Sequence, residues 1–78
     1  MATRKQNEQT FPNWEELSSG GRRYWIDDER DDGILIRYVK LVDENDHTLS
    51  FIQEVYDRKG KLIGVHEKFP FDRGHQQV

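Results

Sequence analysis

Four side chains in the second half of the chain could together perform acid–base chemistry: His66, Glu54, Tyr38 and Lys68. Cleavage of RNA needs a group that moves the proton of a 2′-hydroxyl near neutral pH, and a cation that stabilises the phosphate. Histidine suits the first role, and Lys68 or Arg73 would supply the cation. The spacing is not specific to catalysis, so a polar histidine on an exposed strand face is the alternative interpretation.

No metal or cofactor site is expected from the sequence. The histidines are His47, His66 and His75, and nothing in their spacing forces them together. The acidic run over residues 27–32 lacks the pattern of a calcium loop, because Arg30 stands where an oxygen ligand is required. The absence of cysteine excludes disulfide bonds and cysteine-ligated zinc.

Two arginines and a glutamine interrupt the apolar pattern of one predicted sheet face: Arg23, Arg37 and Gln53. Buried guanidinium groups need partners, so Arg23 and Arg37 are candidate ligands for an anion such as phosphate. The alternative is an uncovered end of the sheet, from which the long side chains reach solvent. The net charge of −3 does not favour nucleic-acid binding, which would need four cations on one surface: Arg22, Arg23, Arg37 and Lys68.

The elements that position these side chains are three strands joined by two tight turns. The strands are predicted over residues 34–42, 48–56 and 61–69. The turn at residues 43–47 contains Asn and Asp, which tolerate left-handed backbone, and the turn at residues 57–60 begins with Asp and ends with Gly. Connections this short cannot hold a crossover helix, so neighbouring strands are expected to be antiparallel.

Pairing Val42 with Thr48 and Asp57 with Lys61 closes both hairpins and predicts two faces for the sheet. The more apolar face is the expected core and collects Leu35, Val39, Leu41, Leu49, Phe51, Val55, Ile63, Val65 and Phe69. The second face holds Val42 and six candidate interface residues: Ile34, Ile36, Tyr38, Ile52, Tyr56 and Leu62. A lone soluble monomer rarely leaves so much apolar surface open.

The N-terminal part is predicted to add a helical cover and a first strand. Residues 11–21 favour a short helix or turn, capped by Asn13 together with Glu16. Residues 22–27 favour a strand, with Trp25 opposite Leu35. The sequence leaves open which sheet face the cover takes, and if it takes the second face, the expected core face becomes the open one.

The predicted fold is therefore α+β and mainly β: a short N-terminal helix or turn, followed by a four-stranded antiparallel β-meander in the order 1-2-3-4. Residues 11–72 would form a single small domain, with a disordered tail over residues 1–10 and a flexible tail over residues 73–78. The 78 residues are 35% charged and 33% hydrophobic, so the core is thin and dimerisation would complete it. A polar N-terminus favours neither a signal peptide nor a membrane anchor, and the expected location is the cytoplasm of a prokaryote or phage.

The ending HEKFPFDRGH (residues 66–75), preceded by a meander and a short helical start, resembles small bacterial toxins of toxin–antitoxin modules. The acidic net charge and the lack of long N-terminal helices depart from that pattern. No functional residues are carried over from the resemblance, and the alternative of a toxin-like RNA-cleaving enzyme centred on His66 depends on the acid–base residues named above. The leading hypothesis is instead a non-catalytic protein-interaction module, acting as a homodimer or as a subunit of a small complex, and nucleic-acid binding is the third alternative.

Overall fold

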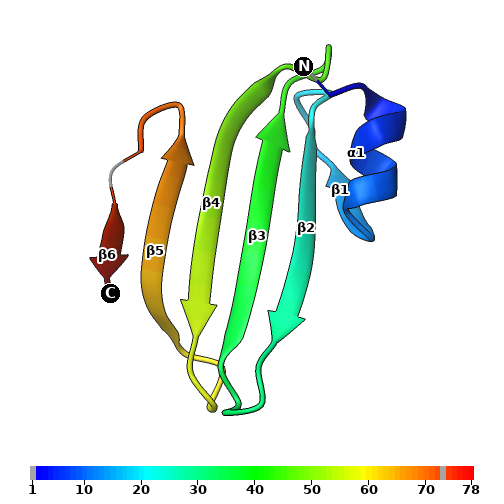
Figure 1. Ribbon diagram of the computed structural model, residues 1–78. Helices are drawn as coiled ribbons and strands as arrows, with labels where there is room; N and C mark the ends of the chain where they lie inside the picture. Colours follow the sequence, from blue (N-terminus) through cyan, green and yellow to red (C-terminus); the bar gives the residue numbers. More distant parts are fainter. Residues whose placement is uncertain (1, 73) are drawn as a thin grey trace.

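The computed structural model describes residues 2–72 and 74–78, which form one antiparallel sheet with a short helix beside it (Figure 1). The helix is α1 (Arg4–Thr10). The strands are β1 (Asn13–Glu16), β2 (Arg22–Glu29), β3 (Leu35–Val42), β4 (Thr48–Tyr56), β5 (Leu62–Phe69) and β6 (His75–Gln77). Each strand pairs with the next along the chain, so the sheet order is β1-β2-β3-β4-β5-β6.

The mainly β, antiparallel architecture is confirmed, but the described residues form six strands rather than four. The additional strands, β1 and β6, lie at the two edges of the sheet (Figure 1). They occupy segments that were expected to be a helix and a flexible tail. The helix itself lies earlier in the chain, because residues 4–10, expected to be disordered, are helical.

Local hydrogen bonds explain where the helix begins. Thr3 Oγ1 accepts a hydrogen bond from the backbone N–H of Gln6 (3.2 Å), and Gln6 Oε1 accepts one from the backbone N–H of Thr3 (2.9 Å). This capping box satisfies two N–H groups at the helix start. Gly20, at a φ of 91°, lies in the tight turn between β1 and β2. This glycine was expected to end a helix, but it closes a β-hairpin instead.

The two central turns form as predicted. Asp57 Oδ1 accepts hydrogen bonds from the backbone N–H groups of Lys59 and Lys61, each at 2.9 Å. Gly60 follows at a φ of 80°, which a residue without Cβ adopts easily. In the preceding hairpin, Asp46 takes the left-handed position at a φ of 62°.

A β-bulge changes the register of the first hairpin. Val42 pairs with Thr48 as predicted, but the next pair is Leu41 with Ser50 and not with Leu49. One extra residue on a strand inverts its alternation, so every later side chain of the strand lies on the face opposite to the predicted one. The predicted faces are therefore wrong for β4.

The second hairpin is also interrupted by bulges. Its ladder starts as predicted beside the turn, but Val55 pairs with Gly64 instead of Ile63. A further irregularity next to Phe51 brings Phe69 opposite Phe51, two residues from the predicted partner. The bulge of the first hairpin, in contrast, decides the faces of β4: Phe51 and Val55 lie on the same side of the sheet as the even-numbered residues of β3, and Ile52 and Tyr56 lie on the other.

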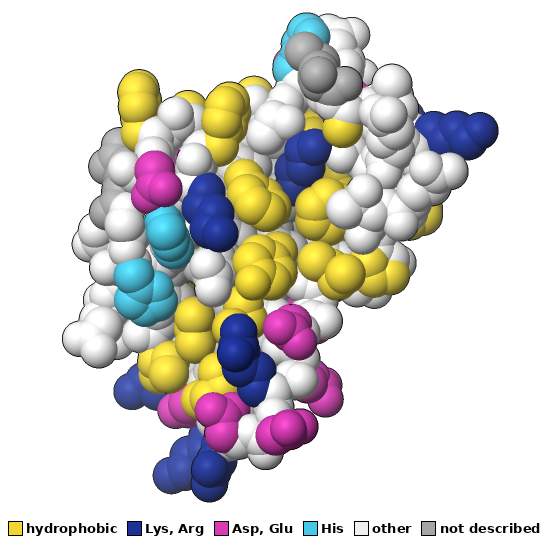
Figure 2. All heavy atoms as spheres, viewed as in Figure 1, with side chains coloured by type: hydrophobic (Ala, Val, Ile, Leu, Met, Phe, Trp, Pro, Cys, Tyr) yellow, Lys and Arg dark blue, Asp and Glu magenta, His cyan; other side chains and the backbone are white. Residues whose placement is uncertain are grey.

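One side of the sheet, which we call the covered face, carries α1 and the main buried cluster. Phe11, Tyr24 and Val42 have exposed fractions of 6%, 0% and 0%, and the rings of Phe11 and Tyr24 lie 5.8 Å apart. Ile26 and Phe51 pack against this cluster. Figure 2 shows apolar side chains gathered over the middle strands beside the helical segment. For β2 and β3, the N-terminal segment thus covers the predicted second face and leaves the expected core face open, whereas Phe51 of the expected core face packs beneath the cover.

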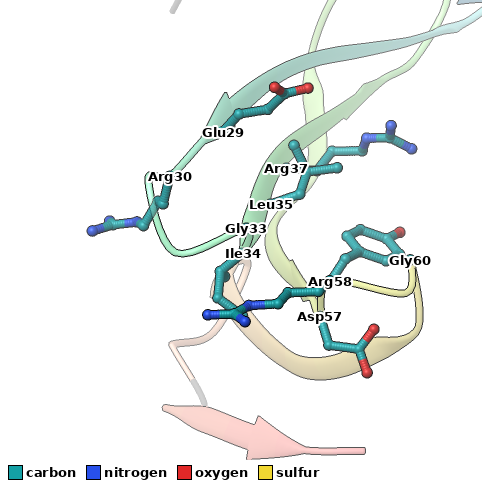
Figure 3. Close-up of a pocket in the computed structure, with 10 residues that line it drawn as sticks. Glu29, Arg30, Gly33, Ile34, Leu35, Arg37, Asp57, Arg58 and Gly60 are labelled. Carbon is teal, nitrogen blue, oxygen red and sulfur yellow. The ribbon is translucent and has the colours of Figure 1, made fainter.

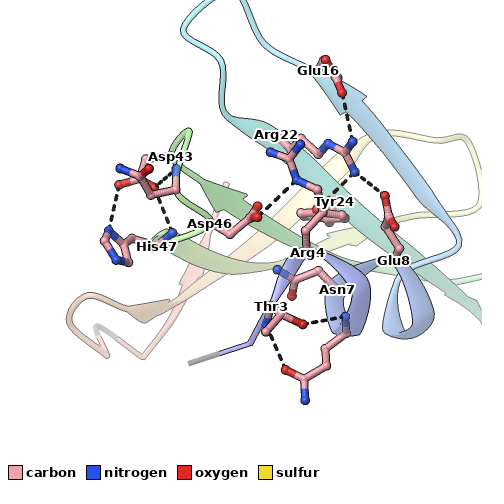
Figure 4. A network of polar contacts seen from close by, with 12 residues as sticks. Thr3, Arg4, Asn7, Glu8, Glu16, Arg22, Tyr24, Asp43, Asp46 and His47 are labelled. Atoms are coloured by element: carbon pink, nitrogen blue, oxygen red, sulfur yellow. Dashed lines mark hydrogen bonds and ion pairs between the residues drawn. The ribbon is translucent and has the colours of Figure 1, made fainter.

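Arg22 joins three elements beneath this cover (Figure 4). One guanidinium nitrogen donates to Glu8 Oε2 of α1 (2.7 Å) and another donates to Glu16 Oε1 of β1 (3.0 Å). The bond to Glu8 contributes most to raising the pKa of Arg22, so this buried group stays charged. At the other end of the helix, Arg4 pairs with Asp46 of the β3–β4 turn (3.2 Å).

Replacing Phe11 with alanine tests whether the N-terminal segment is part of the core. Because the ring is buried against Tyr24, we expect Phe11→Ala to lower the free energy of unfolding by about 3–5 kcal/mol. Phe71→Ala is the matched control, since Phe71 is 68% exposed and its loss should cost less than about 0.5 kcal/mol. Urea unfolding followed by tryptophan fluorescence measures both. Equal effects of the two substitutions would contradict this description of the core.

Candidate interaction surface

The other side of the sheet, which we call the open face, has no helix or strand over it within residues 2–72 and 74–78. Trp25 pairs with Val39 and not with the predicted Leu35. Because side chains alternate with a period of two, this shift of four residues leaves Trp25 on the open face. Its apolar members are Trp25, Leu35, Val39, Leu41, Ile52, Tyr56, Leu62 and Val65. Among them Val39 is buried by its neighbours alone, and the others are half-buried.

Polar side chains on the open face are paired with one another. Arg37 donates two hydrogen bonds to the carboxylate of Asp27, at 2.7 and 3.0 Å, and these raise the pKa of Arg37. The hydroxyl of Tyr56 donates to Glu54 Oε1 at 2.9 Å. Burial, and then this bond, raise the pKa of Tyr56, so the phenol keeps its proton at neutral pH. The face therefore carries charges of both signs between apolar side chains, and the register adds three further carboxylates to it, those of Glu15, Glu29 and Glu67.

The two candidate anion ligands, Arg23 and Arg37, each contact another side chain of the open face. Arg37 is opposite Asp27, which already neutralises it. The guanidinium of Arg23 lies 4.7 Å from the centre of the Trp25 ring, in a cation–π contact. Gln53, expected opposite Arg37, pairs with Tyr38 and lies on the covered face.

A cavity of about 410 Å³ lies at the end of the open face, between the β2–β3 and β4–β5 turns. Leu35 and Tyr56 form its apolar part, and Arg30, Arg37 and Arg58 are its cations. Figure 3 shows that the guanidinium group of Arg37 points away from those of Arg30 and Arg58. The cavity therefore adds concave surface to the open face without a converging set of donors for an anion.

The six predicted interface residues are divided between the two sides of the sheet, because the bulge inverts β4. Ile52, Tyr56 and Leu62 lie on the open face. Ile36 is buried, at 6% exposure, and Tyr38 stacks with Phe51 on the covered face, with ring centres 6.3 Å apart. Ile34 precedes β3 and lines the cavity just described.

The candidate catalytic set is also divided. His66 and Lys68 lie on the side of Tyr38, and Lys68 Nζ is 5.8 Å from the centre of the Tyr38 ring. Glu54 lies on the open face with Tyr56, away from His66. Instead, Asp72 Oδ1 contacts His66 Nε2 at 2.7 Å. No sequence pattern indicates this partner, because the course of the chain after β5 decides which carboxylate returns to His66.

The remaining cations and histidines are dispersed. Arg22 is buried between carboxylates, so the four basic residues considered for nucleic-acid binding do not share a surface. His47 pairs with Asp43 in the β3–β4 turn, at 3.3 Å, while His75 lies opposite His66. Outside the undescribed positions 1 and 73, no group of three or more metal-ligating side chains is present. Arg73, considered as a catalytic cation, lies outside the described residues.

In the described part of the chain, no helix has the length and apolar character needed to cross a membrane. Comparisons with protein-family models, with curated proteins and with solved structures found no match. A function for this chain therefore has to be argued from its own surfaces.

The contact between His66 and Asp72 predicts a measurable pKa change. The backbone N–H of Gly74 and then the ring of His66 hold the pKa of Asp72 below its ordinary value. Such a carboxylate keeps its favourable contacts above its ordinary pKa and loses them as the pH falls through the lowered one. In His66→Ala, we expect the pKa of Asp72 to rise while staying below the ordinary value, because the Gly74 bond remains.

Carboxyl-detected NMR titration measures this shift. His47→Ala is the matched control, because His47 contacts Asp43 and should leave the pKa of Asp72 unchanged. An Asp72 pKa that is the same in the wild type and in His66→Ala would show that the two side chains do not interact in solution.

Proposed function

We propose that this chain is a cytoplasmic, non-catalytic protein-interaction module that pairs with a second copy of itself through the open face. The observation that supports the proposal is the one-sided sheet, whose covered face carries α1 and the buried cluster. Stable domains bury each apolar face of a sheet against a second layer, and none of the described elements forms such a layer over the open face. A second sheet laid over Trp25, Ile52 and Tyr56 would supply the missing layer.

The composition of the open face is that of a binding surface. Trp, Tyr and Arg are enriched among the residues that contribute most to protein interfaces. Here Arg23 lies against Trp25, and Arg37 lies 5.6 Å from the centre of the Tyr56 ring. A guanidinium group is more weakly hydrated than an ammonium group, so burying these stacked pairs in an interface costs less hydration free energy.

The open face carries charges of both signs, which allows a second copy of the chain to be the partner. Arg37 with Asp27 is a neutral pair, and Glu54 on the same face is hydrogen-bonded to Tyr56. Two identical surfaces related by a two-fold axis can place an arginine of one copy opposite a carboxylate of the other when each surface carries both signs. Two such sheets would pack face to face at about 10 Å, as in a β-sandwich.

The sheet edges are less suited to association. β6 has three residues, and β1 has four, of which Glu15 and Glu16 are acidic. Short and charged edge strands discourage the addition of another strand. Pairing through the face is therefore favoured over pairing through an edge.

Light scattering coupled to size-exclusion chromatography tests the proposal. We expect a dimer, and Ile52→Glu should weaken it at least tenfold, because the substitution places an unpaired charge in the centre of the contact. Phe71→Glu is the control, since Phe71 is an exposed apolar residue outside the open face and its substitution should leave the dimer intact. A wild-type monomer at high concentration would refute the dimer.

A second candidate, RNA cleavage, is favoured by one observation: the contact between His66 and Asp72, with His75 across the strand pair. In this proposal one histidine removes the proton of the 2′-hydroxyl, the other protonates the leaving oxygen, and Lys68 contacts the phosphate. Asp72 orients His66. Glu54 has no part, because it lies on the opposite side of the sheet.

An RNA-cleavage assay that detects cyclic phosphate ends tests this candidate. If it is correct, His66→Ala should lower the cleavage rate by at least about 100-fold. His47→Ala should retain the wild-type rate, because His47 lies in the β3–β4 turn. A rate that His66→Ala leaves unchanged would show that any cleavage comes from a contaminant.

A further inference from the structure

A second cavity, which we call the α1 groove, lies on the covered face between the N-terminal segment and strands β3, β4 and β5. Its volume is about 430 Å³, within the roughly 300–1,000 Å³ of sites that bind small molecules. Three aromatic rings line it: Phe11 from the N-terminal segment, Phe51 from β4 and Phe69 from β5. Phe69 keeps 43% of its surface exposed, so a large apolar group remains available at this site.

The α1 groove also contains a cation without a carboxylate partner. Lys40 lines the cavity, and its Nζ donates to Asn7 Oδ1 at 2.8 Å. Within residues 2–72 and 74–78, no carboxylate lies within ion-pair distance of Lys40. Burial lowers the pKa of Lys40, an effect that the negative charge of Asp46 partly opposes. A ligand anion beside this ammonium group would stabilise its charged form.

The amide of Asn7 is a further unsatisfied group beside the same cation. Asn7 is 1% exposed, and its Nδ2 has no hydrogen-bond partner among the described residues. The bond from Lys40 fixes which end of the amide is oxygen, so the unpaired atom is a donor. Buried donors are almost always satisfied, and one without a partner requires an explanation.

We propose that the α1 groove binds a small organic acid whose carboxylate contacts Lys40 and whose apolar body lies among Phe11, Phe51 and Phe69. The carboxylate accepts a hydrogen bond from Lys40 Nζ, and a small rotation of the Asn7 amide lets Nδ2 donate to its second oxygen. One ammonium and one amide match a singly charged head group. A phosphate would need more donors, such as the fork of an arginine, and none of the described residues that line this cavity is an arginine.

Titration with phenylbutyrate, compared with its neutral amide, tests the inference on the unmodified protein. Two-dimensional amide NMR should show saturable shifts in α1 and in strands β3 to β5, and the acid should bind at least tenfold more tightly than the amide. Equal affinities for the two compounds, or no saturable binding at millimolar concentration, would overturn the inference. This comparison requires no substitution, so it remains decisive even if a variant fails to fold.

Lys40→Met then locates the head group, because methionine keeps most of the apolar stem and removes the charge. We expect this variant to bind phenylbutyrate at least tenfold more weakly and to lose its preference for the acid over the amide. Lys61→Met is the matched control, since Lys61 is exposed in the β4–β5 turn and should bind as the wild type does. Unchanged binding by a folded Lys40→Met, confirmed by circular dichroism, would overturn the assignment of Lys40.

Discussion

The packing of Phe11 against Tyr24 and Val42 is the contact on which the rest of the structure depends. It selects which side of the sheet is covered and so leaves the other side open. The ion pairs of Arg22 with Glu8 and Glu16 fix the same arrangement, because they tie α1 and β1 to β2. Both surfaces follow from this packing. The open face is the side that the N-terminal segment does not cover, and the α1 groove lies where that segment fits the sheet incompletely.

The turns and the four long strands follow from local chemistry, which explains why the sequence predicts them well. Asp57 accepts hydrogen bonds from the backbone of its own turn, and Gly60 supplies the left-handed backbone that closes it. Such turns need no distant partner. The strands β3, β4 and β5 were predicted to within one residue at each end, because each is bounded by residues of this kind.

The faces of the sheet could not be predicted, because β4 has adjacent apolar residues in both registers. Phe51 and Ile52 are neighbours, as are Val55 and Tyr56, so a strand turned over by a bulge shows the same apolar pattern. The candidate interface and catalytic sets were divided for this reason. The helix at residues 4–10 had one signal, Thr3 followed by Gln6, in a segment without the apolar periodicity on which helix prediction relies.

The strand order has a consequence for how the chain acquires its structure. Because every strand pairs with its nearest neighbour in the sequence, the sheet can grow by successive hairpins, each closing a short loop. The N-terminal cover depends instead on contacts between residues far apart in the sequence. Asn7 contacts Lys40, 33 residues further on, and Arg4 contacts Asp46, 42 residues further on. During synthesis α1 and Phe11 emerge before the strands they cover, so Phe11 has no complete surface to pack on until β3 and β4 have followed it. This segment is thus made before the central strands but reaches its final contacts after them.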